Sequence, residues 1–276
     1  MVNFNWKEYI GYRSDLKKNW NGQLRARIHY YLFKPFESHI LKKSNAKNIT
    51  IFGSCRINIP EGNSLNKDIT HVHNTKETLQ LIKFLKGKTT FEKPYDKLCF
   101  RTPIISDNPN ACIKYTEKYR DIFKSTELFI LEISSRKKYT SNNYHLHHLS
   151  IDKRLNFYKN TPKNILKDCK IEEQTNNEIK KDILKIRKEL YPKKLLIISH
   201  INARIDGKVI KKRNELINLV REICTKNKIP FIDPTILLKE HKQKEVLYSD
   251  LVHYTKRGRY LIHKIIKKTI IRQGMY

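Results

Sequence analysis

The stretch Ile49-Thr50-Ile51-Phe52-Gly53-Ser54-Cys55-Arg56 decides the fold. Its first four residues are apolar or β-branched, which is typical of an interior parallel strand. The strand breaks at Gly53, and the next two residues supply a hydroxyl and a thiol. Further short strands are expected at residues 69–73, 128–133, 195–198 and 229–232, and the last three of these segments are also apolar. Because helical patterns separate these segments, the chain predicts an α/β fold with a parallel sheet sandwiched by helices.

The expected helices have recognisable ends and apolar stripes. Asn74 is a typical N-cap with Glu77 three residues later, and Gly87 ends the helix that follows. Further helices are expected at residues 113–123, 176–190, 216–224 and 255–271. Residues 1–48 are a basic, aromatic-rich extension that we expect to be helical, and residues 49–276 form the α/β domain. Residues 137–177 carry far more chain than a crossover requires, which indicates an insertion or a lid.

The net charge of the 276-residue chain is +30. One interpretation is a polyanionic partner, such as nucleic acid, an anionic glycan or an anionic membrane surface. The other is compositional drift under AT-rich codon usage, because lysine, asparagine and isoleucine dominate and the lysines are spread along the chain. Either interpretation predicts weak, non-specific binding of polyanions.

We expect the chain to contain no segment that would direct it to a membrane or out of the cell. No run of 18 apolar residues exists, so we expect no transmembrane segment. The first twenty residues are charged throughout and contain no apolar core of a signal peptide. The five cysteines have no Cys-x-x-Cys spacing, which argues against a disulfide framework or a zinc site. These features predict a cytoplasmic protein with reduced thiols.

A second segment, Asp250-Leu251-Val252-His253, follows the last expected strand. It places a carboxylate and an imidazole three residues apart, on a turn before a helix. Since functional sites of open α/β sheets lie at the carboxyl ends of the strands, this pair should meet the Gly53 turn at one edge. Nucleophile, base and orienting acid are the three parts of an acyl-transfer site.

These two segments resemble the two signature blocks of the SGNH/GDSL hydrolase superfamily. The matching residues are Phe52-Gly53-Ser54-Cys55 and Asp250 to His253, with Tyr254, Thr255 and Gly258 continuing the second block. The resemblance implies a flavodoxin-like three-layer sandwich with about five parallel strands. It also implies an esterase or acyltransferase that acts on an ester or thioester, with acylated carbohydrates as the expected substrates and no cofactor.

The resemblance also implies roles for the residues in the two blocks. His253 is the general base and Asp250 orients it. The family's nucleophile stands two residues after the glycine, where this chain has Cys55, as in a Gly-Ser-Cys, GSCFA-like branch. A turn shifted by one residue would instead make Ser54 the nucleophile, so both residues are candidates.

The oxyanion-hole glycine and asparagine blocks of that superfamily have no recognisable equivalent here. The candidates for oxyanion or substrate binding are therefore polar groups near strand ends: Gly53, Arg56, Ser134, Ser135, Arg136, His200, Asn202 and Arg204. The three arginines could bind an anionic group such as a carboxylate, sulfate or phosphate, or could be ordinary surface charges.

Two groups of histidines are candidates for metal ligands. His145, His147 and His148 lack a carboxylate pair at ligand spacing apart from Asp152, so we expect a solvated or substrate-lining loop and no metal. His71 and His73 alternate on an expected strand, and we expect them to be structural.

Two other functions fit the same residues. In one, the fold is kept, catalysis is lost and the basic surface binds a polyanion, such as nucleic acid, an anionic glycan or a membrane surface. In the other, a transferase uses a nucleotide-bearing donor, although the chain has neither common type of phosphate-binding glycine loop. The oligomeric state cannot be inferred from the sequence.

Overall fold

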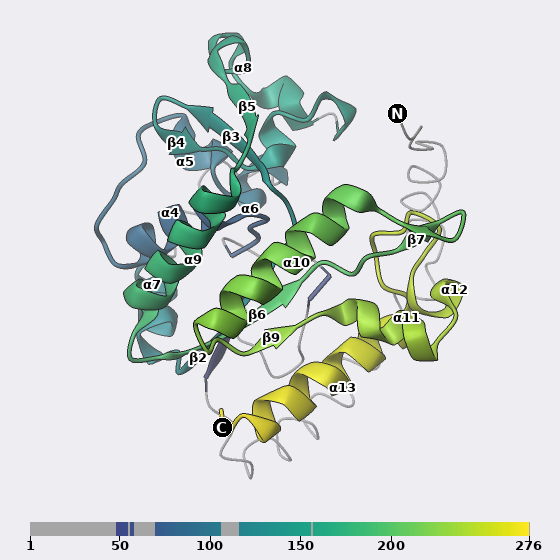
Figure 1. The fold of residues 1–276 in the computed structure, drawn as a ribbon. Helices are drawn as coiled ribbons and strands as arrows, with labels where there is room; N and C mark the ends of the chain where they lie inside the picture. The colour runs from purple at the N-terminus through teal and green to yellow at the C-terminus, as the bar shows by residue number, and fades with distance from the viewer. Residues whose placement is uncertain (1–47, 55, 58–69, 106–115, 156, 276) are drawn as a thin grey trace, which may run out of the picture.

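A parallel sheet forms the centre of the molecule (Figure 1). The computed structural model describes residues 48–54, 56–57, 70–105, 116–155 and 157–275. Within these ranges the sheet has the order β1-β2-β6-β9. Its strands are β1 (Ile49–Phe52), β2 (Leu128–Ile133), β6 (Lys194–Ser199) and β9 (Phe231–Ile232). All three pairings are parallel, so the predicted α/β class is confirmed.

The sheet is buried on both faces, which explains why its strands read as continuous apolar runs. On one face, Phe52, Phe129 and Ile197 belong to a core built with α4 (Thr75–Leu85), α7 (Thr116–Ser125), α9 (Asn176–Leu190) and α10 (Lys211–Lys226). On the other face, Ile51 and Ile130 pack with α13 (Lys256–Arg272). The result is the expected three-layer sandwich.

The predicted strand at residues 69–73 is not formed over residues 70–73, which carry no strand assignment. The reason lies in their backbone hydrogen bonds, which reach the ends of two other strands. Thr70 O accepts from Gly53 N–H at 3.0 Å, and His73 O accepts from Ser134 N–H and Ser135 N–H, each at 3.0 Å. The segment therefore crosses the carboxyl ends of β1 and β2, and four parallel strands are described where about five were expected. Ile69 lies outside the described residues.

The expected helices are present, and α10 is longer at both ends than the predicted residues 216–224. Asn74 caps α4 by accepting from Lys76 N–H and Glu77 N–H, and the Glu77 carboxylate accepts from His73 N–H at 2.9 Å. Gly87 follows with a left-handed φ of 70°, as the predicted helix stop requires. Helix α9 has the predicted bounds. The predicted N-terminal helical extension and residues 113–115 lie outside the described residues.

The region expected to be an insertion or lid holds a small antiparallel sheet of its own, with the order β4-β3-β5. Its strands are β3 (Lys137–Ser141), β4 (Tyr144–His145) and β5 (Lys170–Glu173). Between β4 and β5 lie η2 (His148–Ser150), η3 (Lys153–Leu155), η4 (Phe157–Asn160) and α8 (Lys163–Asp168). The strands of this region are short and mostly polar, so the sequence pattern did not predict them.

The remaining elements are short. They are α5 (Tyr95–Leu98), α6 (Arg101–Ile105), β7 (Arg204–Ile205), β8 (Lys208–Val209), η5 (Pro234–Ile236), α11 (Leu237–Glu240) and α12 (Gln243–Val246). None of the helices in the described part of the chain combines the length and apolarity needed to span a bilayer.

Candidate active site

The turn after β1 is packed against the end of β2. Gly53 N–H donates to Thr70 O, and a Cβ added at Gly53 would lie 2.8 Å from Glu132 Cβ. Real Cβ atoms do not approach so closely, so only glycine fits here. The sharp break that the sequence predicted at Gly53 thus has a steric cause.

Both described residues that flank Cys55 contact one carboxylate. Ser54 N–H donates to Glu132 Oε2 at 2.7 Å, and Arg56 Nε–H donates to Glu132 Oε1 at 3.1 Å. The Ser54 hydroxyl accepts from Arg56 N–H at 3.3 Å, and Ser54 is only 5% exposed. Cys55 itself lies outside the described residues.

Asp250 and His253 form the pair that the sequence predicted. Asp250 Oδ2 lies 2.5 Å from His253 Nδ1, while Oδ1 accepts from Val252 N–H and His253 N–H, each at 2.9 Å. Leu251, with a left-handed φ of 56°, makes this tight turn possible. Burial alone would raise the pKa of Asp250, but these hydrogen bonds hold it below its usual range. Asp250 is therefore ionised and fixes the Nδ1–H tautomer, which leaves the lone pair of His253 on Nε2.

Helix α10 ties the Asp250–His253 turn to the end of β6. Arg213 donates to Leu251 O at 3.1 Å and to Ile201 O at 3.0 Å. Burial, followed by the nearby charge of Arg56, lowers the pKa of Arg213 to about 10. Two guanidinium groups, Arg56 from the Gly53 turn and Arg213 from α10, thus lie near each other.

The two turns border one cleft of about 370 Å³. The Gly53 turn contributes Arg56 and the Asp250 turn contributes Val252. The other lining residues are His73, Glu77, Ser134, Ser135, Lys137, Tyr139, His148, Asp152, Arg154, His200 and Arg213. This cleft lies at the carboxyl edge of the sheet, where the sequence placed the site.

The predicted binding residues divide into two groups. Arg56, Ser134, Ser135 and His200 line the cleft, whereas Arg136, Asn202 and Arg204 do not. Arg136 donates to Asn176 Oδ1 at 2.7 Å and to Gln174 O. Asn202 is buried and accepts from Ile210 N–H, and Arg204 borders a separate hollow with Gly207 and Gln243.

Some of the polar groups in the predicted residues that line the cleft already form hydrogen bonds within the protein. The amides of Ser134 and Ser135 donate to His73 O, so neither is available to an oxyanion. His200 Nδ1 lies 2.6 Å from Ile201 O and acts as the donor to it. Burial, then Arg56 and Arg213, lower the pKa of His200 well below its usual value, so the ring is neutral.

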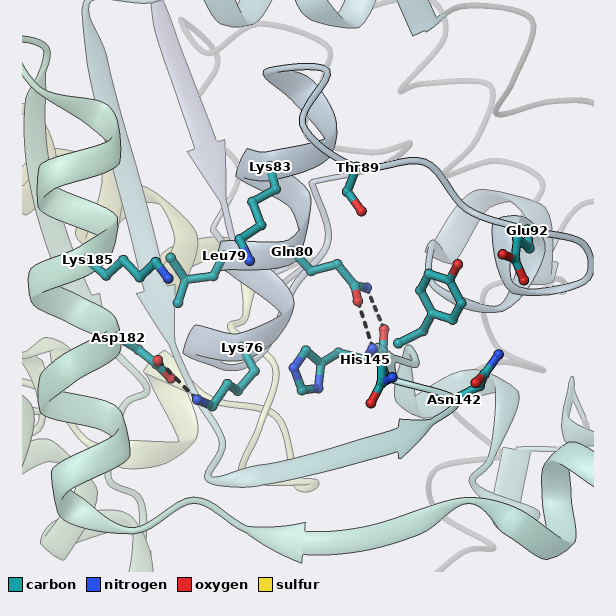
Figure 2. Close-up of a pocket in the computed structure, with 12 residues that line it drawn as sticks. Lys76, Leu79, Gln80, Lys83, Thr89, Glu92, Asn142, His145, Asp182 and Lys185 are labelled. Carbon is teal, nitrogen blue, oxygen red and sulfur yellow. Dashed lines mark hydrogen bonds and ion pairs between the residues drawn. The ribbon is translucent and has the colours of Figure 1, made fainter.

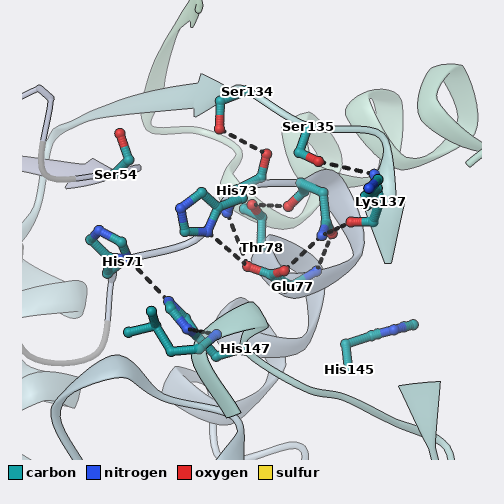
Figure 3. A network of polar contacts seen from close by, with 12 residues as sticks. Ser54, His71, His73, Glu77, Thr78, Ser134, Ser135, Lys137, His145 and His147 are labelled. Carbon is teal, nitrogen blue, oxygen red and sulfur yellow. Dashed lines mark hydrogen bonds and ion pairs between the residues drawn. The ribbon is translucent and has the colours of Figure 1, made fainter. Parts of the chain in front are cut away.

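Four histidines gather beside the cleft, two from the segment before α4 and two from the region after β4, and Figure 3 shows His71, His73 and His147 of this set. Ring centroids within the set His71, His73, His147 and His148 lie 4.4–5.4 Å apart. Burial is the largest cause lowering the pKa of each ring, to about 3 for His73 and His148. His148 lines the cleft, as one of the two interpretations of its loop expected, but His147 is buried and the solvated interpretation is wrong for it.

Three of these rings, His71, His73 and His147, have the spacing of a metal site, with ligand atoms within 4.8 Å of one another. Their hydrogen bonds oppose that use. Leu149 N–H donates to His147 Nδ1 at 3.2 Å, so the proton of the neutral ring sits on Nε2. That Nε2–H points at His71 Nδ1, 3.0 Å away, and cannot also offer a lone pair to a metal. His71 and His147 are hydrogen-bonded and His73 packs against both rings, and the sequence did not reveal that residues so far apart in the chain meet.

A larger hollow of about 510 Å³ lies between α4, α9 and the β3–β4 hairpin (Figure 2). Gln80 closes its floor by bonding both backbone groups of His145, and Lys76 is paired with Asp182 at 3.1 Å. None of the residues predicted to act in catalysis or binding lines it.

Sequence comparison identifies the family. Residues 47–160 and 153–268 match the family of the TviD N-terminal domain, and the chain belongs to that family. No curated protein sequence matches the chain.

Two solved structures have similar folds. One is a lipase/acylhydrolase from Enterococcus faecalis, with 13% identity, a TM-score of 0.40, and coverage of 81% of this chain and 95% of that one. The other is a catalytic mutant of an acetylxylan esterase from Geobacillus stearothermophilus, with 13% identity, a TM-score of 0.41, and coverage of 82% and 94%.

Proposed function

We propose that the protein is an SGNH-like esterase or acyltransferase that acts through Cys55, His253 and Asp250. The observation that carries the proposal is the Asp250–His253 pair, in which a carboxylate holds the imidazole on a turn whose Val252 lines the same cleft as Arg56 of the Gly53 turn. Its geometry is that of an oriented general base, and a glycine-bounded turn bearing a thiol borders the same cleft.

Cys55 suits the role of nucleophile better than Ser54 does. An acyl-enzyme nucleophile commonly uses its own amide to hold the oxyanion. The amide of Ser54 is committed to the Glu132 carboxylate at 2.7 Å, and its hydroxyl accepts a hydrogen bond from the chain. Cys55 also stands two residues after the glycine, where the resembled superfamily has its nucleophile.

The chemistry follows from these roles. His253 Nε2 takes the thiol proton, the Cys55 sulfur forms a bond to the acyl carbon, and the ester C–O bond breaks as His253 returns the proton to the leaving oxygen. Water or an acceptor hydroxyl then attacks the thioester and gives up its proton to His253, and the C–S bond breaks as the Cys55 sulfur takes that proton back. Arg56, whose buried Nη2 finds no hydrogen-bond partner among the described residues, is a candidate to stabilise the negative oxygen.

The cleft fits an acylated carbohydrate. Hydroxyl, imidazole and charged groups dominate its walls, and four cationic side chains outnumber the carboxylates of Glu77 and Asp152 there: Arg56, Lys137, Arg154 and Arg213. Such a surface favours a polar substrate that carries an anionic group. An acylated or anionic glycan is therefore the substrate class that we propose.

The test is turnover of acetylated sugars and of p-nitrophenyl acetate by the wild type and by Asp250→Asn. We expect hydrolysis or transfer by the wild type and a loss of about 10³–10⁴-fold in kcat/KM in the variant, because the wrong imidazole tautomer is then favoured. Asp121→Asn, which changes an exposed aspartate on α7 paired with Lys124 and outside the cleft, is the matched control. Absence of turnover, together with salt-dependent heparin binding that Asp250→Asn leaves intact, would instead favour the binding-protein function.

A further inference from the structure

Glu132 is the one charged residue in β2, a strand otherwise made of leucine, isoleucine and phenylalanine. It is 2% exposed. A carboxylate buried so deeply is costly unless it is paired and fully hydrogen-bonded. The contacts of Glu132 are therefore informative about why an acid stands in this strand.

Both carboxylate oxygens of Glu132 are used by the turn that carries Cys55. Oε2 accepts from Ser54 N–H at 2.7 Å, and Oε1 accepts from Arg56 Nε–H at 3.1 Å. The two donors belong to the residues immediately before and after Cys55. A single rigid side chain on an interior strand thus holds the backbone on one side of the thiol and the guanidinium on the other.

Glu132 packs tightly against the turn formed by Gly53 to Arg56. Gly53 leaves room for Glu132 Cβ, since a methyl group there would lie 2.8 Å from it. The Arg56 side chain, paired with Glu132, is only 9% exposed. The turn therefore cannot shift without breaking a buried ion pair, a buried amide hydrogen bond or this steric contact.

Glu132 also lies near the second catalytic turn. Tyr254, the residue after His253, is buried, and burial followed by the Glu132 charge raises the pKa of its phenol. Glu132 thus lies close enough to Tyr254 for its charge to act on the phenol.

We propose that Glu132 is a positioning residue, which fixes the Cys55 turn relative to His253 and neutralises Arg56. This inference rests on the proposed function, because it concerns the placement of that site's nucleophile. Glu132 does not contact the substrate. It acts through Ser54 and Arg56, and its effect should appear in the rate of the chemical step more than in substrate binding.

The ion pair of Glu132 with Arg56 allows a test that distinguishes a positioning role of Glu132 from a purely structural one. Glutamine at position 132 keeps the size of the side chain and an oxygen for Ser54 N–H, but removes the negative charge. Arg56, the next residue in the chain after Cys55, then lacks its counter-charge, and an unpaired cation near a thiol favours the thiolate. We therefore expect the thiol to become more reactive while turnover falls.

The experiment compares wild type, Glu132→Gln and, as a control, Glu222→Gln, an exposed glutamate on α10 paired with Lys226. We expect Glu132→Gln to lower kcat/KM for p-nitrophenyl acetate by about 10²-fold, with KM changed less than about threefold. The apparent pKa for alkylation of Cys55 by iodoacetamide should fall in the same variant. Glu222→Gln should leave all three values unchanged.

Turnover by Glu132→Gln within threefold of wild type would overturn the inference, as would an unchanged Cys55 alkylation profile. If Glu132→Gln fails to fold, Arg56→Lys removes the Nε–H donor to Glu132 but keeps the positive charge. It should lower kcat by a similar factor, and wild-type kcat in that variant would equally overturn the inference. If Cys55→Ala retains full activity, the proposed function itself is wrong, whatever the result for Glu132→Gln.

Discussion

Replacing Cys55 by alanine is expected to lower kcat/KM for an acetylated substrate by about 10⁴-fold or more, whereas Ser54→Ala should retain activity within about tenfold. The difference follows from the contacts of Ser54. Its amide is bound to Glu132 and is unaffected by a side-chain change, and its hydroxyl only accepts a hydrogen bond from Arg56 N–H. Loss of that single bond is worth about 1 kcal/mol.

The measurement is the initial rate of acetate release by both variants at equal concentration of folded protein. Thermal unfolding of each variant controls for folding. Cys55→Ser, which keeps a nucleophilic oxygen, should recover a detectable fraction of the rate. The reverse pattern, with Ser54→Ala inactive and Cys55→Ala active, would assign the nucleophile to Ser54 and require a different oxyanion donor.

The second large effect is expected in stability against acid. The folded protein keeps the His71, His73, His147 and His148 rings neutral, because burial lowers their pKa values, to about 3 for two of them. In the unfolded chain these histidines have their ordinary pKa of about 6.5. The unfolded state therefore takes up more protons between about pH 6.5 and pH 3, and the free energy of unfolding must decrease as the pH falls through this range.

The size of this effect is about 1.4 kcal/mol per pH unit for each fully shifted histidine. Glu77 opposes it in part. Burial raises the pKa of Glu77 to about 7, so the folded state takes up that proton first and gains stability as the pH falls from about 7 to 4.5. Four histidines against one glutamate still leave a loss of several kcal/mol, a large share of the usual stability of a domain.

Urea unfolding at pH 7.5, 6.0 and 5.0 measures the slope. His148→Asn removes one of the four groups and should flatten the dependence on pH relative to wild type. A free energy of unfolding that is independent of pH between 7.5 and 5.0 would contradict the neutral, buried cluster.

The parts of this molecule that could be predicted from sequence depend on short-range patterns. Strand β2 and helix α9 follow from continuous apolar runs and from 3.6-residue periodicity with a capping box. Asp250 and His253 are three residues apart, so one turn brings them together.

The parts that could not be predicted depend on contacts between distant residues. Glu132 interacts with Ser54 and Arg56 across two strands, and His71 meets His147 across 76 positions. A lone glutamate in an apolar strand was the available signal for the first of these. The strand expected at residues 69–73 is not formed over residues 70–73, because the Thr70 and His73 carbonyls accept from the ends of β1 and β2 instead of from a neighbouring strand.

The most direct test of a histidine-activated thiol at Cys55 is its rate of alkylation by iodoacetamide across pH, in wild type and in His253→Ala. Peptide mass spectrometry assigns the label, since Cys169 is partly exposed and Cys112 lies outside the described residues, whereas Cys99 and Cys224 are buried. The account predicts fast labelling of Cys55 with a pKa below the ordinary thiol value of about 8.5, and loss of this reactivity in His253→Ala. Slow labelling with an ordinary thiol pKa in both proteins would contradict it.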